Sequence, residues 1–171
     1  AAYPQMSFKY EVEGSENCNK IKELSLKQMT LQSNINGLVK DPNIGNDSIE
    51  SIVGRMLQAY KQDIKTSYIF KEPMKAYAYY ALFQTVQLGN VNTLIFNPRN
   101  NKDDVKVFAA VATSWDTYYP GAERGKNLHN IAIEGMKDIR IIENQMAQQQ
   151  IEASKVSVNG CIELALQDNK G

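Results

Sequence analysis

The stretch "KIKELSLKQMTLQSNINGLVKDP", Lys20 to Pro42, decides the fold class. Its apolar residues recur at alternating intervals of three and four, which places them on one face of an α-helix. The resulting seam consists of Ile21, Leu24, Gln28, Leu31, Ile35 and Leu38. Pro42 ends the pattern, because proline lacks the N–H that a helix interior needs. The sequence therefore predicts a helix that begins near Ser15, a suitable N-cap, and buries one face against partners.

Four more segments have helical periodicity, over residues 48–68, 72–88, 103–115 and from residue 123 to beyond residue 153. Residues 91–96 are either a short strand or an irregular crossing. At the start of the chain, Phe8, Tyr10 and Val12 alternate with polar residues, as in a half-buried extended segment. The sequence thus predicts an all-α, single-domain helical bundle of about five helices. We expect a short extended N-terminal arm over residues 1–16 and the bundle over residues 17–171.

The composition excludes some functional classes. The 171 residues include 19 basic and 19 acidic side chains. A nucleic-acid-binding protein usually has a basic excess, because counterion release drives much of its affinity, so no nucleic-acid partner is expected. No apolar run is long enough for a transmembrane segment. The opening "AAYPQ" is typical of what remains after signal-peptide cleavage. We therefore expect a secreted or periplasmic protein.

The two cysteines, Cys18 and Cys161, lie near opposite ends of the chain. In an oxidising compartment they are predicted to form a disulfide, with the helix-weakening residues 157–160 allowing the chain to turn. The alternative is two separate reduced thiols, buried as small apolar groups. A catalytic dithiol is disfavoured, because there is no Cys-x-x-Cys pair.

Catalytic and metal-binding patterns are sparse. His129 is the single histidine, which rules out a histidine-rich zinc site, and no cofactor or metal is expected. Glu134 and Asp138 share a helix face, an arrangement that could serve a hydrolase. Neighbouring Lys137 and Arg140 favour an ordinary charged surface instead. The sequence therefore predicts a protein that is not an enzyme.

Tyrosines and glutamines indicate where partners could bind. Tyr118 and Tyr119 follow a predicted helix and should be exposed, and tyrosine is enriched at protein interfaces. Gln148, Gln149 and Gln150 lie on a polar part of the last helix. These residues favour a non-enzymatic exported protein that acts through a protein partner or a homo-oligomer. A subunit of a cell-envelope or secretion assembly, or a secreted effector, fits this description.

A second function is compatible with the same bundle. A small apolar ligand could occupy a pocket between the second, third and fourth helices. The residues expected to line that pocket are Tyr60, Tyr80, Phe108 and Trp115.

Overall fold

The structure is a computed structural model that describes residues 2–170, with side chains described for residues 14–162. The first helix, α1, spans Ala2–Val39, and α2 spans Asn46–Ile64. A π-helical turn, η1 (Lys65–Ile69), continues α2. The short α3 (Ala76–Leu82) leads to a hairpin of β1 (Thr85–Leu88) and β2 (Val91–Leu94). Helices α4 (Lys102–Tyr118) and α5 (Glu123–Lys170) complete the chain. The predicted all-α bundle is confirmed, with a small antiparallel sheet added.

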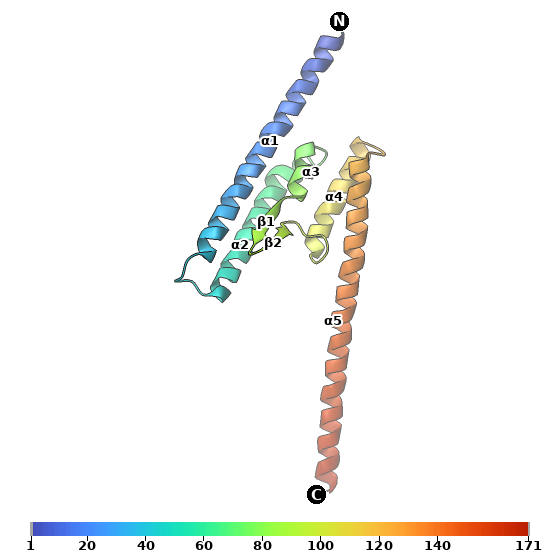
Figure 1. Cartoon of the computed structure of the whole chain (residues 1–171). Helices are drawn as coiled ribbons and strands as arrows, with labels where there is room; N and C mark the ends of the chain where they lie inside the picture. Colours follow the sequence, from blue (N-terminus) through green and yellow to red (C-terminus); the bar gives the residue numbers. More distant parts are fainter. Residues whose placement is uncertain (1, 171) are drawn as a thin grey trace.

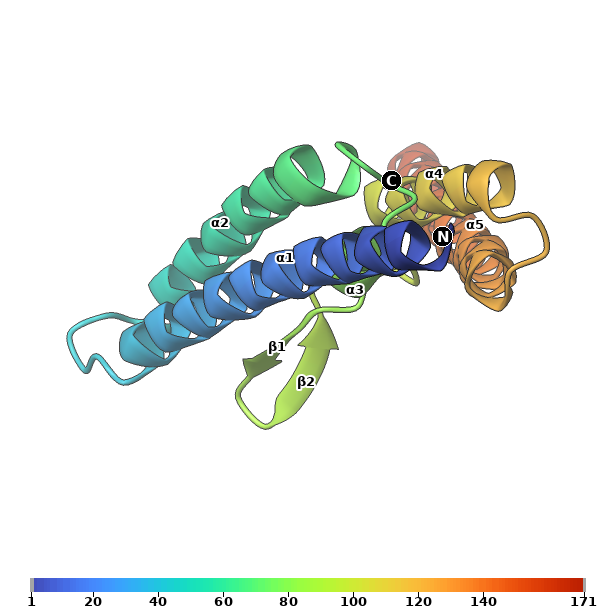
Figure 2. The ribbon, with the colours of Figure 1, turned by 90° about the horizontal axis from the view of Figure 1, so that it is seen from above.

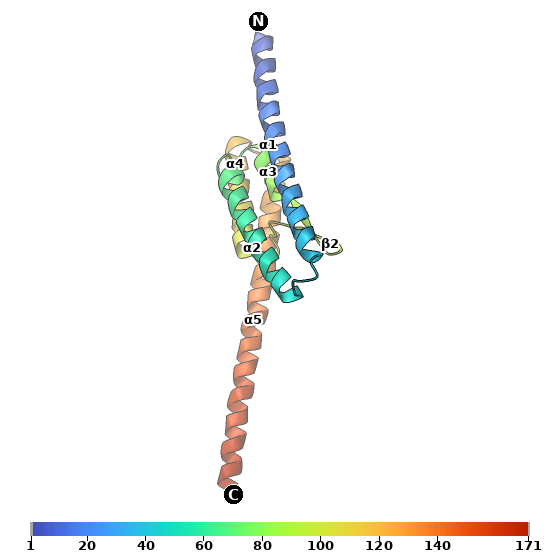
Figure 3. The same cartoon turned by 90° about the vertical axis from the view of Figure 1, so that its left-hand side faces the viewer.

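The helices form two pairs. Helices α1 and α2 lie side by side, as do α4 and α5; α3 lies between the pairs, and the hairpin lies beside α1 (Figures 1 and 2). The start of α1 and the end of α5 project from this body at opposite ends (Figure 3). Residues 2–16, expected as an extended arm, are the first part of α1.

The core lies where the helix pairs and the hairpin meet. From the seam predicted in the first helix, Leu24, Leu31 and Ile35 are buried. The most completely buried large side chains come from all five helices, from η1, from β1 and from the loop after β2; they are Tyr77, Phe96, Phe108, Leu24, Ile35, Ile64, Ile69, Leu82, Leu128, Val86, Val105 and Val111. Burying apolar surface of this kind is the main favourable contribution to folding.

The helix predicted over residues 72–88 ends early. Helix α3 stops at Leu82, and residues 85–88 form β1 instead. Gly89 has φ = +65° at the first position of the two-residue turn between β1 and β2, as a type II′ hairpin turn requires. The turn and the cross-strand pairing override the helical spacing of this segment.

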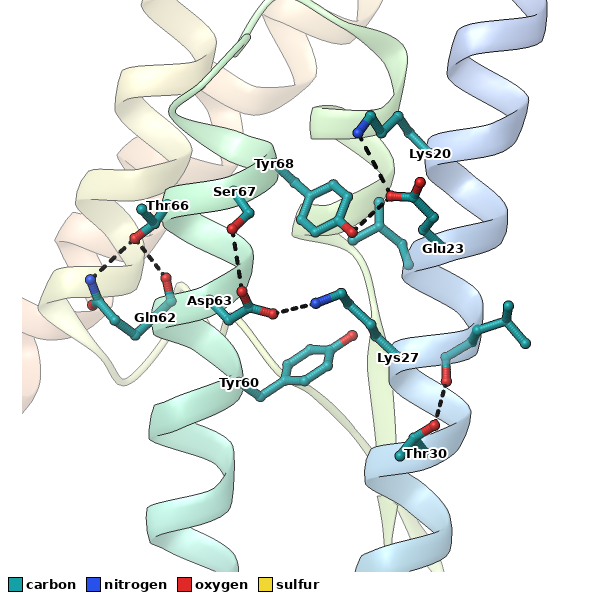
Figure 4. Close-up of polar contacts among 12 residues, drawn as sticks. Lys20, Glu23, Lys27, Thr30, Tyr60, Gln62, Asp63, Thr66, Ser67 and Tyr68 are labelled. Carbon is teal, nitrogen blue, oxygen red and sulfur yellow. Dashed lines mark hydrogen bonds and ion pairs between the residues drawn. The ribbon is translucent and has the colours of Figure 1, made fainter.

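A polar seam joins α1 to α2 and η1 (Figure 4). Lys27 forms an ion pair of 2.7 Å with Asp63, and the Tyr68 hydroxyl donates to the Glu23 carboxylate at 3.0 Å. Burial, together with the Glu23 carboxylate, raises the pKa of Tyr68 to about 12. The phenol of Tyr68 is therefore a neutral donor at physiological pH.

Beyond the middle of α5, the described side chains have no cover. Every residue from Arg140 to Asn159 is exposed. The 48-residue helix is about 72 Å long at 1.5 Å per residue, and only its first half packs against α4. The helix also continues without a break through residues 157–160, where the sequence predicts a weak point.

The predicted disulfide is absent. Cys18 on α1 and Cys161 on α5 are both free and exposed. A disulfide needs Cα atoms less than about 7 Å apart. The unbroken α5, to which Cys161 belongs, instead runs away from the body, and its C-terminal end lies opposite the start of α1 (Figure 1). The alternative of two buried thiols is wrong as well, because both side chains face solvent.

Candidate protein-interaction surfaces

An aromatic surface lies where α4 turns into α5. We define it as Tyr79, Trp115, Tyr118, Tyr119 and Arg124. Tyr118 and Tyr119 are 58% and 47% exposed, as the sequence predicts. The turn is tight: Gly121 has φ = +78°, a conformation that favours glycine. It returns the chain so that the first turn of α5 lies against the last turn of α4.

Three rings of this surface, those of Tyr79, Trp115 and Tyr119, contact one another in a row. The Trp115 ring centroid lies 5.1 Å from that of Tyr119 and 5.8 Å from that of Tyr79. The Trp115 indole N–H donates to the Pro73 carbonyl at 3.1 Å, which fixes the ring. Tyr119 is thus an exposed ring held against a buried one, an arrangement that loses little conformational entropy on binding.

Arg124 covers part of this row. Its guanidinium carbon lies 5.4 Å from the Tyr79 ring centroid and 5.9 Å from that of Trp115. These distances are in the range of cation–π attraction. Asn127 also donates to the Tyr79 hydroxyl, at 3.2 Å. Tryptophan, tyrosine and arginine are the residues most often found at energetic hot spots of interfaces.

Two of these residues were not expected as site residues. Tyr79 lies on a second face of the helix predicted over residues 72–88. The spacing of the aromatic residues in this helix does not indicate which face contacts Trp115. Arg124 follows a turn, and only the folded turn brings it over the rings. In the local sequence, only the tyrosine pair beside a Pro-Gly turn indicates an interaction surface here.

The single histidine and the two carboxylates considered from the sequence each have an interaction partner of their own. His129 on α5 hydrogen-bonds to Asp116 on α4. Glu134 pairs with Lys137 at 2.9 Å, and Asp138 pairs with Arg99 at 3.4 Å, so each carboxylate has its own cation. Across the described side chains, no group of three or more His, Cys, Asp or Glu residues is placed to hold a metal ion.

The second predicted contact region is on the uncovered half of α5. Gln148, Gln149 and Gln150 are exposed there. From residue 144 to residue 162, no described side chain makes a hydrogen bond or ion pair. Apolar side chains are exposed on the same stretch: Met146, Ile151, Val156, Val158 and Ile162. This half of α5 is therefore available for contact with another molecule.

The four residues of the predicted ligand pocket are dispersed. Tyr60 donates to Gln84 at 2.6 Å, and the Tyr80 hydroxyl hydrogen-bonds to Ser25 at 3.0 Å. Trp115 belongs to the aromatic surface. Phe108 is fully buried against α5 and Phe83 and forms part of a groove wall. The structure does not gather the four around one described cavity.

A different cleft has the size of a small-molecule site. Its volume is about 680 Å³, and it lies between the end of α1, the start of α2 and the hairpin turn. Apolar residues make most of its wall: Ile35, Val39, Ile49, Val53, Leu57 and Leu88. Cavities of this volume commonly hold small ligands.

Comparisons with known proteins do not assign the chain to a family. No family model matches it, and neither the curated proteins nor the solved structures include a detectable relative. Among the helices that the structure describes, none combines the length and apolar character that crossing a bilayer requires.

Proposed function

We propose that this chain is an exported, non-enzymatic helical-bundle protein that acts by binding other proteins. A subunit of a cell-envelope or secretion assembly, or a secreted effector, fits this role. The observation that carries the proposal is the aromatic surface, in which exposed Tyr119 contacts a fixed Trp115 and Arg124 lies over the Trp115 ring, with exposed Tyr118 just before Tyr119 at the end of α4. The uncovered half of α5 is a second area available to a partner.

Site-specific photo-crosslinking in the native cells tests this proposal. A photoreactive amino acid replaces Tyr118, and the matched control replaces Leu26, an exposed apolar residue on α1. We expect a discrete protein adduct from position 118 that is absent from position 26. Equal adduct patterns at the two positions would count against the aromatic surface as a binding site.

Export is a separate part of the proposal. Free Cys18 and Cys161 remove the support that a disulfide would have given it. Fractionation of the native cells tests the compartment directly. Recovery of the protein from the periplasm or the medium supports export, and recovery from the cytoplasm contradicts it.

The cleft beside the hairpin turn favours a second candidate function, a carrier of small apolar ligands. Its volume of about 680 Å³ and its mostly aliphatic wall carry this alternative. Native mass spectrometry of protein purified from its own cells tests it. A co-purifying ligand that is lost in Val53→Trp, which fills the cleft, would favour the carrier; apo protein alone would contradict it.

A further inference from the structure

The two edges of the hairpin differ in how their backbone groups are satisfied. Val86 pairs with Thr93 and Leu88 with Val91, and the Ile95 N–H donates to the Gln84 carbonyl at 3.0 Å. In an antiparallel ladder the hydrogen-bonded pairs alternate. The backbone groups of Thr93 therefore point toward β1. Those of Asn92 and Leu94 point outward, along the free edge of β2.

The corresponding edge of β1 is closed by side chains of α1. The Gln32 side-chain amide donates to the Gln87 carbonyl at 2.9 Å and accepts from the Gln87 N–H at 2.7 Å. It thus makes both hydrogen bonds that a neighbouring strand would make. Gln28 donates to the Thr85 carbonyl at 2.9 Å. Exposed edges attract further strands, and on β1 these two glutamines prevent that.

The edge of β2 is open. Within the part of the chain that the structure describes, nothing hydrogen-bonds to the outward N–H and C=O groups of Asn92 and Leu94. The strand "VNTL" also contains no proline or charged residue, the usual protection of a free edge. Hence β2 has the hydrogen-bonding capacity to accept a further strand.

This open edge faces a groove of about 510 Å³ whose opposite wall is α5. Phe83, Phe108 and Ile131 supply its apolar part. Two charged residues, Arg99 and Glu134, also line the groove. Arg99 forms an ion pair with Asp138, and Glu134 forms one with Lys137. The groove is therefore close to neutral, and it complements an uncharged segment better than a charged one.

We propose that the groove between β2 and α5 binds an extended, uncharged polypeptide segment by strand addition to β2. Backbone hydrogen bonds to Asn92 and Leu94 hold the segment, and its alternate apolar side chains fill the space over Phe83, Phe108 and Ile131. This is β-augmentation. It names the chemistry of one partner segment, and it does not depend on the aromatic surface.

Amide hydrogen exchange measured by NMR tests the proposal with a defined probe. The probe is a capped hexapeptide of alternating threonine and leucine. Its matched control has the same sequence with the amide nitrogens of the three leucines methylated. We expect the probe to slow exchange of the outward Asn92 and Leu94 amides. We also expect the methylated peptide to bind at least about tenfold more weakly, since each lost hydrogen bond is worth roughly 1 kcal/mol.

A variant of the protein provides the second arm. Asn92→Pro removes an outward N–H without removing a ladder hydrogen bond to β1, because proline is tolerated on an edge strand. The exchange of the Thr93 amide should stay slow, which shows that the hairpin is intact, while probe affinity falls. If the methylated peptide bound as tightly as the probe, the groove would bind peptides through apolar contacts alone. That result, or unchanged Asn92 and Leu94 exchange at millimolar probe, would overturn strand addition. Failure here would leave the photo-crosslinking result at Tyr118 unaffected.

Discussion

A buried ion pair between Lys61 and Asp104 holds the two helix pairs together. The Lys61 ammonium lies 2.7 Å from a carboxylate oxygen of Asp104, and the side chains are only 13% and 3% exposed. The same oxygen accepts the Asn97 N–H at 2.8 Å. Lys61 comes from α2 and Asp104 from the first turn of α4, whose N-cap is Asn101. The pair thus fixes α4 against α2 and positions the loop that precedes α4.

Replacing Lys61 with methionine leaves the Asp104 carboxylate buried without its cation. Removing one member of a buried pair typically costs about 3–5 kcal/mol, a large share of the roughly 5–15 kcal/mol that stabilises a domain. The double variant Lys61→Met/Asp104→Asn removes the buried charge and keeps an acceptor for the Asn97 N–H. We therefore expect the double variant to recover at least half of the lost stability.

Urea unfolding followed by circular dichroism at 222 nm measures both variants. Lys102→Met is the matched control, because the pair of Lys102 with Glu143 is exposed at 3.4 Å and such pairs contribute less than about 1 kcal/mol. A stability loss in Lys61→Met no larger than that in Lys102→Met would refute a structural role for the buried pair. A double variant no more stable than Lys61→Met would refute it as well.

Three further predictions concern other parts of the fold. The raised pKa of Tyr68, about 12, keeps its phenol protonated in the folded protein, whereas an unfolded tyrosine ionises near pH 10. Ionisation of Tyr68 should leave the free energy of unfolding unchanged below pH 10 and should lower it by about 2–3 kcal/mol between pH 10 and 12; urea titrations should show a weaker fall with pH for Tyr68→Phe. Gln32→Leu should cost about 1–3 kcal/mol, because the Gln87 N–H and C=O lose their partner; an unchanged urea midpoint would argue against edge closure. Cys18 and Cys161 should both be alkylated in the folded, unreduced protein; mass spectrometry that finds an intramolecular disulfide would contradict the rigid α5.

Local periodicity predicts the helices well. Leu24, Leu31 and Ile35 recur at helical spacing and are buried. The exposure of Tyr118 and Tyr119 also follows from local sequence, because a Pro-Gly turn comes directly after them.

Contacts distant in sequence decide what periodicity misses. The spacing of residues 85–88 predicts the end of a helix. In the structure they form β1, whose outer edge is hydrogen-bonded by Gln28 and Gln32, more than 50 residues away in the sequence. The stacking of Arg124 on Tyr79 depends on a tertiary approach of α5 to α3. The disulfide prediction is wrong for a related reason. Ser157 to Gly160 have low helix propensity, but the helix runs on to Lys170 and separates the cysteines.

The affinity of the crosslinked partner for Tyr119→Ala is the most direct measurement of the proposed function. Tyr119 packs against Trp115 with its ring tilted, so its truncation should remove a hot-spot contact of about 2 kcal/mol, a roughly 30-fold loss of affinity. The melting temperature should stay close to that of the parent, because the ring is 47% exposed. Leu26→Ser, on α1, should leave affinity unchanged. A Tyr119→Ala protein that folds normally and binds the partner within twofold of the parent would contradict recognition through the aromatic surface.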